Sequence, residues 1–144
     1  MPLAQLNVAV MREPLDSPTM ESFVARLAEV NAAAEAADGF VWRLKDDDGP
    51  GATSYRLLGD DMLLVNLSVW RDLESLRTFV IGHDGHRTAL QSRRTWFTPA
   101  SEPMTVCWYV DVGHVPTLEE AERQLLRLRR EGQSPEVFAF SYRD

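Results

Sequence analysis

The sequence predicts a single α+β domain in which an antiparallel sheet carries two helices on one face, followed by an extra C-terminal helix and strand. The chain has 144 residues, about the size of one ordinary domain, and 44% of them are hydrophobic, enough to bury a core. Segments in which apolar and polar residues alternate are separated by segments with apolar residues at helical spacing. The first six such segments follow the order strand, helix, strand, strand, helix, strand.

The first strand is expected over residues 3–11, where the two faces differ in character. One face would carry Leu6, Val8 and Val10, and the other Gln5, Asn7 and Ala9. Ser17 followed by Pro18 is typical of an N-cap and a first helical turn, and apolar residues then recur at helical spacing as far as Ala36.

The second strand is expected over residues 40–44, and the Asp-, Gly- and Pro-rich residues 45–61 should form an exposed loop. The strongest strand is predicted over residues 62–70. Its fully apolar face would carry Leu63, Val65, Leu67 and Val69.

The remaining elements are marked by their capping residues. Asp72 should cap a helix that Gly82 and Gly85 interrupt and that resumes over residues 86–96. A fourth strand is expected over residues 103–111. Thr117 and Glu120 form a capping box that opens a helix to Arg130, and residues 136–142 could form a last strand.

This order of elements is the ferredoxin-like β-α-β-β-α-β pattern. Right-handed crossovers would place the first and third strands side by side in the centre of the sheet. These strands have the cleanest apolar faces, which we assign to the two helices. The opposite face would be mixed, carrying Gln5, Asn7, Asn66, Ser68 and Trp70, with Arg43 or Trp42 according to register.

The mixed face is too aromatic to face water and too polar to be an ordinary core, so something should cover it. A second copy of the chain would do so. Two such sheets facing each other would form a closed barrel with a cavity on each side, and a homodimer is therefore expected. The C-terminal helix and strand are candidates for reaching across to the partner.

Charge and composition exclude several classes of function. The net charge of −7 disfavours binding to phosphate backbones, so no nucleic-acid partner is expected. The single cysteine, Cys107, excludes an internal disulfide framework and a cysteine zinc cluster. No apolar stretch approaches the length of a membrane span, and the first residues resemble no secretory signal, so a cytoplasmic protein is expected. Nucleotide-binding, hydrolase and zincin motifs are missing.

Several blocks of the sequence resemble the bacterial family called domain of unknown function 3291 (DUF3291). They are L-A-Q-L-N at 3–7, G-F-V-W-R-L at 39–44, L-V-N-L-S-V-W at 64–70, F-V…H-R at 79–87, W-F at 96–97 and G-H-x-P-T at 113–117. The family is similar to the dimeric α/β-barrel superfamily. That superfamily includes antibiotic-biosynthesis and haem-degrading monooxygenases, chlorite dismutases, aldoxime dehydratases and polyketide cyclases. The resemblance implies a fold and a dimer, whereas fold alone does not fix a reaction.

His86 is the candidate base or proton shuttle, because it falls in the segment that borders the cavity in this superfamily. Haem-binding members carry an axial histidine in a comparable place, so His86 is also a candidate haem ligand. A structural role, in which His86 orders the broken helix, is the alternative. His83 is its neighbour, but the segment offers too few further ligands, and no metal site is predicted.

Asn66, with Asn7 and Ser68, could hold a carbonyl or enolate oxygen in a dry cavity, or could instead fix the register of a dimer interface. Aromatic walls formed by Trp42, Trp70 and Trp96 would suit a flat hydrophobic ligand, although such residues are also common in cores. Arg43 could pair with a carboxylate of the ligand or form a salt bridge.

The sequence thus predicts a monooxygenase-like oxidoreductase that acts, without a cofactor, on a hydrophobic or aromatic metabolite. In it His86 and Asn66 are catalytic, and Asn7, Ser68, Trp70, Arg43, Trp42 and Trp96 bind the substrate. The alternatives are a haem protein with His86 as axial ligand, a non-catalytic module that binds a small molecule, and a cofactor-free cyclase or isomerase.

Overall fold

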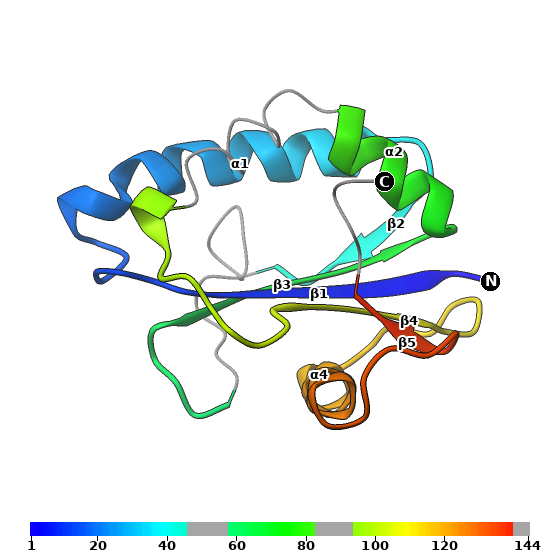
Figure 1. Cartoon of the computed structure of the whole chain (residues 1–144). Coiled ribbons are helices and arrows are strands. Elements are labelled where there is room, and N and C mark those ends of the chain that lie inside the picture. The colour runs from blue at the N-terminus through cyan, green and yellow to red at the C-terminus, as the bar shows by residue number, and fades with distance from the viewer. Residues whose placement is uncertain (46–57, 83–93, 140–144) are drawn as a thin grey trace.

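The computed structural model describes residues 1–45, 58–82 and 94–139, which form one antiparallel sheet with helices on both faces (Figure 1). The strands lie in the order β2-β3-β1-β4-β5. The predicted central placement of the first and third strands is therefore confirmed. The strands are β1 (Leu3–Val10), β2 (Phe40–Arg43), β3 (Leu63–Trp70), β4 (Thr105–Tyr109) and β5 (Val137–Phe138).

Helices α1 (Glu21–Ala36) and α2 (Leu73–Gly82) cover one face of the sheet, and α4 (Leu118–Glu131) covers the other. A short 3₁₀ turn over Pro18–Met20 leads into α1. Two predicted caps are present, since Asp72 Oδ1 accepts a hydrogen bond from Ser75 N at 2.8 Å and Thr117 Oγ1 accepts one from Glu120 N at 3.1 Å. The Ser17 side chain, in contrast, forms no cap hydrogen bond.

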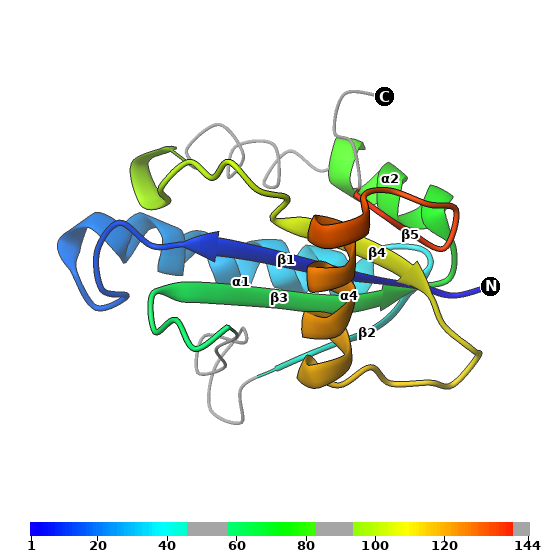
Figure 2. The ribbon, with the colours of Figure 1, turned by 60° about the horizontal axis from the view of Figure 1, so that its bottom comes forward.

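The apolar faces of β1 and β3 pack against α4, so their assignment to the first two helices is wrong. Their core includes Leu6, Val65 and Leu67 from the strands, and Leu125 and Leu128 from α4. Figure 2 shows α4 lying across the strands. The reason lies in α4 itself, where Ala121, Leu125 and Leu128 recur at a spacing that forms one apolar stripe.

The mixed face of the sheet lies beneath α1 and α2 of the same chain, so the prediction that a second copy covers it is also wrong. The buried residues of α1, Asn31 and Ala34, are polar or small, and they suit a sheet face that is itself partly polar. A second cluster of buried residues forms on this side around Trp70, Leu76 and Val80. The homodimer remains a prediction, without its original argument.

The register of β2 decides whether Arg43 or Trp42 lies on the mixed face. The pairing of β2 with β3 shifts between Phe40 and Trp42, so that Arg43 lies opposite Ser68. Arg43 consequently lies on the α1 side, whereas Trp42 packs against the core on the α4 side.

Several predicted elements lie partly outside the described residues. They include most of the loop over 45–61, much of the helix expected over 86–96 and the end of the last strand. Residues 94–96 do form a helical turn, and β5 is described over two residues. Among the described helices, none has the length and apolar character that a bilayer span requires.

Candidate functional site

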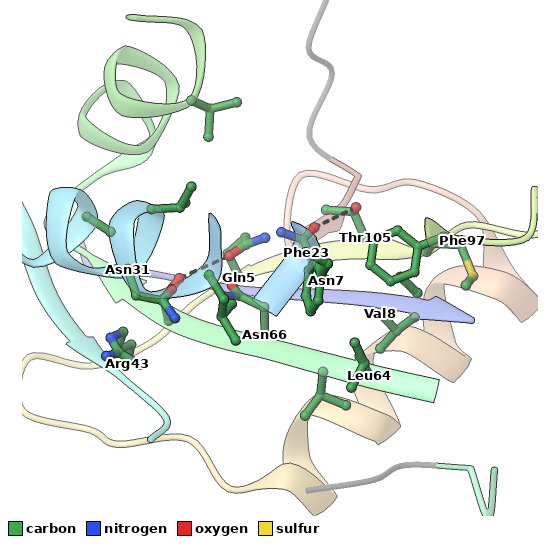
Figure 3. A pocket seen from close by; sticks show the side chains of 18 of the residues that line it. Gln5, Asn7, Val8, Phe23, Asn31, Arg43, Leu64, Asn66, Phe97 and Thr105 are labelled. Atoms are coloured by element: carbon green, nitrogen blue, oxygen red, sulfur yellow. Dashed lines mark hydrogen bonds between the residues drawn. The ribbon is translucent and has the colours of Figure 1, made fainter. Parts of the chain in front are cut away.

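A cavity of about 600 Å³ lies between the sheet and α1. Its floor is the mixed face of β1 and β3, its roof is α1, and the segment from Arg94 to Ala100 lines part of its wall. Figure 3 shows the side chains of Gln5, Asn7 and Asn66 from the strands gathered near those of Asn31 and Phe23 from α1. The face that sequence reasoning selected therefore does line a cavity, but one formed within a single chain.

A chain of three hydrogen bonding groups is buried in the floor. Trp70 Nε1 donates to Ser68 Oγ at 3.0 Å, and Ser68 Oγ donates to Gln5 Oε1 at 3.0 Å. Ser68 lies directly opposite Gln5 in the β1–β3 register. Because the Gln5 oxygen accepts the Ser68 proton, the Gln5 Nε2 group is left as a donor in a residue that lines the cavity.

Asn7 and Asn66 face each other across β1 and β3 two residues further along. Thr105 Oγ1 donates to Asn7 Oδ1 at 2.7 Å, which leaves the Asn7 amide nitrogen as a donor. No hydrogen bond ties the Asn66 side chain to another described residue. The floor therefore offers three side-chain amides, two of which have their oxygen atoms already engaged.

Aromatic rings form the two ends of the cavity. At one end Trp70 stacks on Phe79 with ring centroids 5.3 Å apart and meets the edge of Phe40 at 5.6 Å. At the other end Phe23 contacts Trp96 at 5.4 Å and Phe97 at 5.2 Å, edge to face. Flat apolar walls with a few polar groups between them are typical of sites for small organic ligands.

Arg43 is buried at the edge of the cavity and is held by an acidic residue of α1. Its Nε donates to Glu35 Oε1 at 2.7 Å, and Lys45 Nζ lies 3.1 Å from the same oxygen. The hydrogen bonds from Lys45 and then from Arg43 lower the pKa of Glu35. The predicted salt bridge of Arg43 is thus present, whereas its pairing with a carboxylate of the ligand stays a prediction.

The structure brings six of the predicted site residues together around one cavity: Asn7, Asn66, Ser68, Trp70, Trp96 and Arg43. Trp42 lies on the other side of the sheet. His86, with His83, lies outside the described residues, so its roles as base or haem ligand stay predictions. No group of three or more potential metal ligands occurs among the described residues.

The sequence analysis did not predict that Asn31 and Phe23 line the cavity. It placed Gln5 on the mixed face but did not name it as a site residue. The sequence did mark Asn31, because it is a polar residue within an otherwise apolar helical stripe. The structure shows that its side chain is buried and lines the cavity. Nothing marked Phe23 beyond its place in that stripe, because the α1 face was assigned to the wrong side of the sheet.

The fold of this chain is similar to that of several solved ferredoxin-like proteins. SnoaB, a cofactor-independent oxygenase from Streptomyces nogalater, is 16% identical with a TM-score of 0.53, covering 81% of this chain and 98% of its own. Rv0793 from Mycobacterium tuberculosis is 14% identical with a TM-score of 0.54, covering 79% of this chain and 100% of its own. A candidate antibiotic biosynthesis monooxygenase from Chloroflexus aurantiacus J-10-fl is 12% identical with a TM-score of 0.50, covering 80% and 98%.

The chain belongs to the family described as Domain of unknown function (DUF3291), whose model matches residues 2–144. No curated protein matches the chain. At these identities the solved structures show the fold alone, and the predicted ferredoxin-like architecture is confirmed.

Proposed function

We propose that this protein is a small oxygenase-like enzyme that acts on a hydrophobic, partly aromatic metabolite in the cavity beneath α1. One observation supports this most directly: the floor between two aromatic walls presents the amide groups of Gln5, Asn7 and Asn66 to the cavity. The cavity volume of about 600 Å³ is in the range of sites for small organic ligands.

The amide groups would stabilise negative charge on a substrate oxygen. Amide N–H donors that are fixed before the reaction and shielded from water favour an oxyanion strongly. The hydrogen bond from Ser68 fixes the Gln5 amide, and the one from Thr105 fixes the Asn7 amide. Asn66, opposite Asn7, is the third such donor and the one we assign to the reacting oxygen.

We further propose that the reaction needs no cofactor, as SnoaB is a cofactor-independent oxygenase of similar fold. The substrate must then supply the electrons. A hydroxyaromatic compound that reacts with O₂ to give a quinone and water loses four electrons in total. One oxygen atom enters the ring, and the other leaves as water with the two hydrogen atoms lost from the substrate.

Two parts of the proposal are carried from the sequence. His86 would accept the substrate proton and return it in a later step. The protein would also form a homodimer, which would contain two sites because the described residues of one chain line a cavity by themselves.

Oxygen uptake tests the proposal. Dialysed protein would be incubated with two- and three-ring hydroxyaromatic compounds under ¹⁸O₂, and the products analysed by mass spectrometry. We expect uptake with one labelled oxygen in the product. Asn66→Leu should lower kcat/KM by about a hundredfold, as does loss of one oxyanion donor in other enzymes. Gln124→Leu, an amide-to-leucine change on α4 away from the cavity, should leave kcat/KM unchanged.

Three results would contradict this function. Full turnover by Asn66→Leu would remove the role of the amide floor. A compound that binds and is recovered unchanged under O₂ would support a non-catalytic binding module instead. A product at the oxidation level of the substrate would indicate a cyclase or isomerase.

A further inference from the structure

The charged side chains among the described residues that line the cavity have a single sign. The chain contains 22 acidic and 15 basic residues, so its surface as a whole is acidic. Among the described residues that line the cavity, however, there are three arginines and no aspartate or glutamate. The three are Arg26, Arg43 and Arg94. This reversal of charge indicates a ligand that is negatively charged.

Arg43 does not supply the free positive charge, because Glu35 holds it at 2.7 Å. Arg26 and Arg94 differ from it. Neither takes part in an ion pair within the described part of the chain. Their charges are therefore available to a ligand.

Both arginines belong to the end of the cavity that Phe23 and Trp96 form. Arg26 follows Phe23 by three residues on α1, and residues at this spacing share a helix face. The segment that carries Arg94 is tied to the start of α1, because Trp96 Nε1 donates to Ser22 Oγ at 2.8 Å. It is also tied to the end of β1, because Arg12 Nε donates to the Arg94 carbonyl at 2.7 Å.

We propose that the cavity binds its ligand as an organic anion, whose flat apolar body lies between the aromatic walls. Its carboxylate or ionised enol oxygen is held by Arg26 and Arg94. This inference rests on the proposed function and narrows its substrate to acidic aromatic compounds. It also fits the electrostatics, since no lining residue in the described ranges is a carboxylate that would repel an anion.

A matched pair of probes tests this inference. The anion 1-hydroxy-2-naphthoate and its neutral analogue 1-hydroxy-2-naphthamide would be titrated by quenching of tryptophan fluorescence, as Trp70 and Trp96 line the cavity. We expect the anion to bind about tenfold more tightly at low salt, with this preference shrinking as salt is added.

Variants assign the preference to the two arginines. Arg26→Gln and Arg94→Gln should each weaken naphthoate binding by about tenfold, while leaving naphthamide binding unchanged. Arg26→Lys should retain part of the affinity for the anion. Arg130→Gln, which removes an exposed arginine from α4, should change neither titration. Circular dichroism would show that each variant is folded.

The outcomes separate this inference from the proposed function. Equal affinity for the two probes, or equal loss of both in the arginine variants, would overturn the anion site and leave a neutral aromatic substrate in place. If neither compound binds to the wild-type protein, the aromatic ligand cavity fails, and the anion site with it.

Discussion

The two faces of the sheet differ in how they are filled. On the α4 side, side chains from β1, β3 and β4 interlock with one helix in a continuous apolar core. On the α1 side, the same strands present amides and hydroxyls to a cavity, and aromatic rings close its ends. Close packing stabilises a fold, whereas a cavity lined by polar groups costs stability and offers a place for a ligand. One face therefore supports the structure, and the other is available for chemistry.

Truncating the α4 core should have the largest effect. Leu125 is fully buried on α4, and Leu125→Ala should lower the free energy of unfolding by about 3 kcal/mol, because it leaves a cavity in a packed core. The measurement is chemical denaturation followed by circular dichroism. Leu126→Ala is the matched control, since this neighbour is 42% exposed and should cost less than about 0.5 kcal/mol. Equal losses would mean that α4 does not pack as described.

Breaking the buried hydrogen bonds of the cavity floor should have an intermediate effect. Ser68→Ala removes the hydroxyl between Trp70 Nε1 and Gln5 Oε1 and leaves both without that partner. We expect a loss of about 2 kcal/mol in the free energy of unfolding and a change in tryptophan emission. Ser101→Ala, at an exposed position, provides the baseline. A Ser68→Ala protein as stable as the wild type would argue against this hydrogen-bond chain.

One change on the α4 side should increase stability. Gln124 Oε1 is buried on α4 and has no hydrogen-bond partner among the described residues. Gln124→Leu removes this unsatisfied oxygen and should raise the free energy of unfolding by about 1 kcal/mol. Thermal and urea unfolding would both report it. Destabilisation instead would mean that the oxygen is satisfied in solution.

Acidification should destabilise the α1 side of the sheet before the α4 side. Of the four effects predicted here, this change in stability should be the smallest. The pKa of Glu35 is lowered by hydrogen bonds from Lys45 and Arg43, and that of Asp38 by hydrogen bonds from Arg71. A lowered pKa in the folded state adds stability above the ordinary carboxyl pKa, and this is lost as the pH falls through the folded value. Below about pH 4, amides of α1 should therefore lose protection relative to their intrinsic exchange rates.

Hydrogen exchange read by mass spectrometry resolves α1 from α4 for this purpose. Asp38→Asn should flatten the acid response at the end of α1, since it removes the carboxylate paired with Arg71. A greater loss of protection in α4 than in α1 on acidification would reverse the predicted order of the two faces.

Local signals determined most of the secondary structure. The alternation along β1 and β3 identified both strands, and Asp72 and Thr117 marked the beginnings of α2 and α4 through bonds within a few residues. Such contacts join residues close in sequence, so a single chain segment carries the information. The order of elements was likewise enough to place β1 beside β3.

The sequence also identified which face carries the polar site, through Asn7, Asn66 and Ser68. It did not determine what covers that face, because every covering element is amphipathic and each could satisfy either side of the sheet. The outcome depends on how α1 and α4 complement the two faces at once, through contacts such as Asn31 over the cavity and Leu125 against Leu67 and its neighbours. That arrangement of helices also creates the cavity, brings two arginines to its lining and leaves Trp42 on the other side of the sheet. Each of these features depends on the register and packing of segments far apart in the chain.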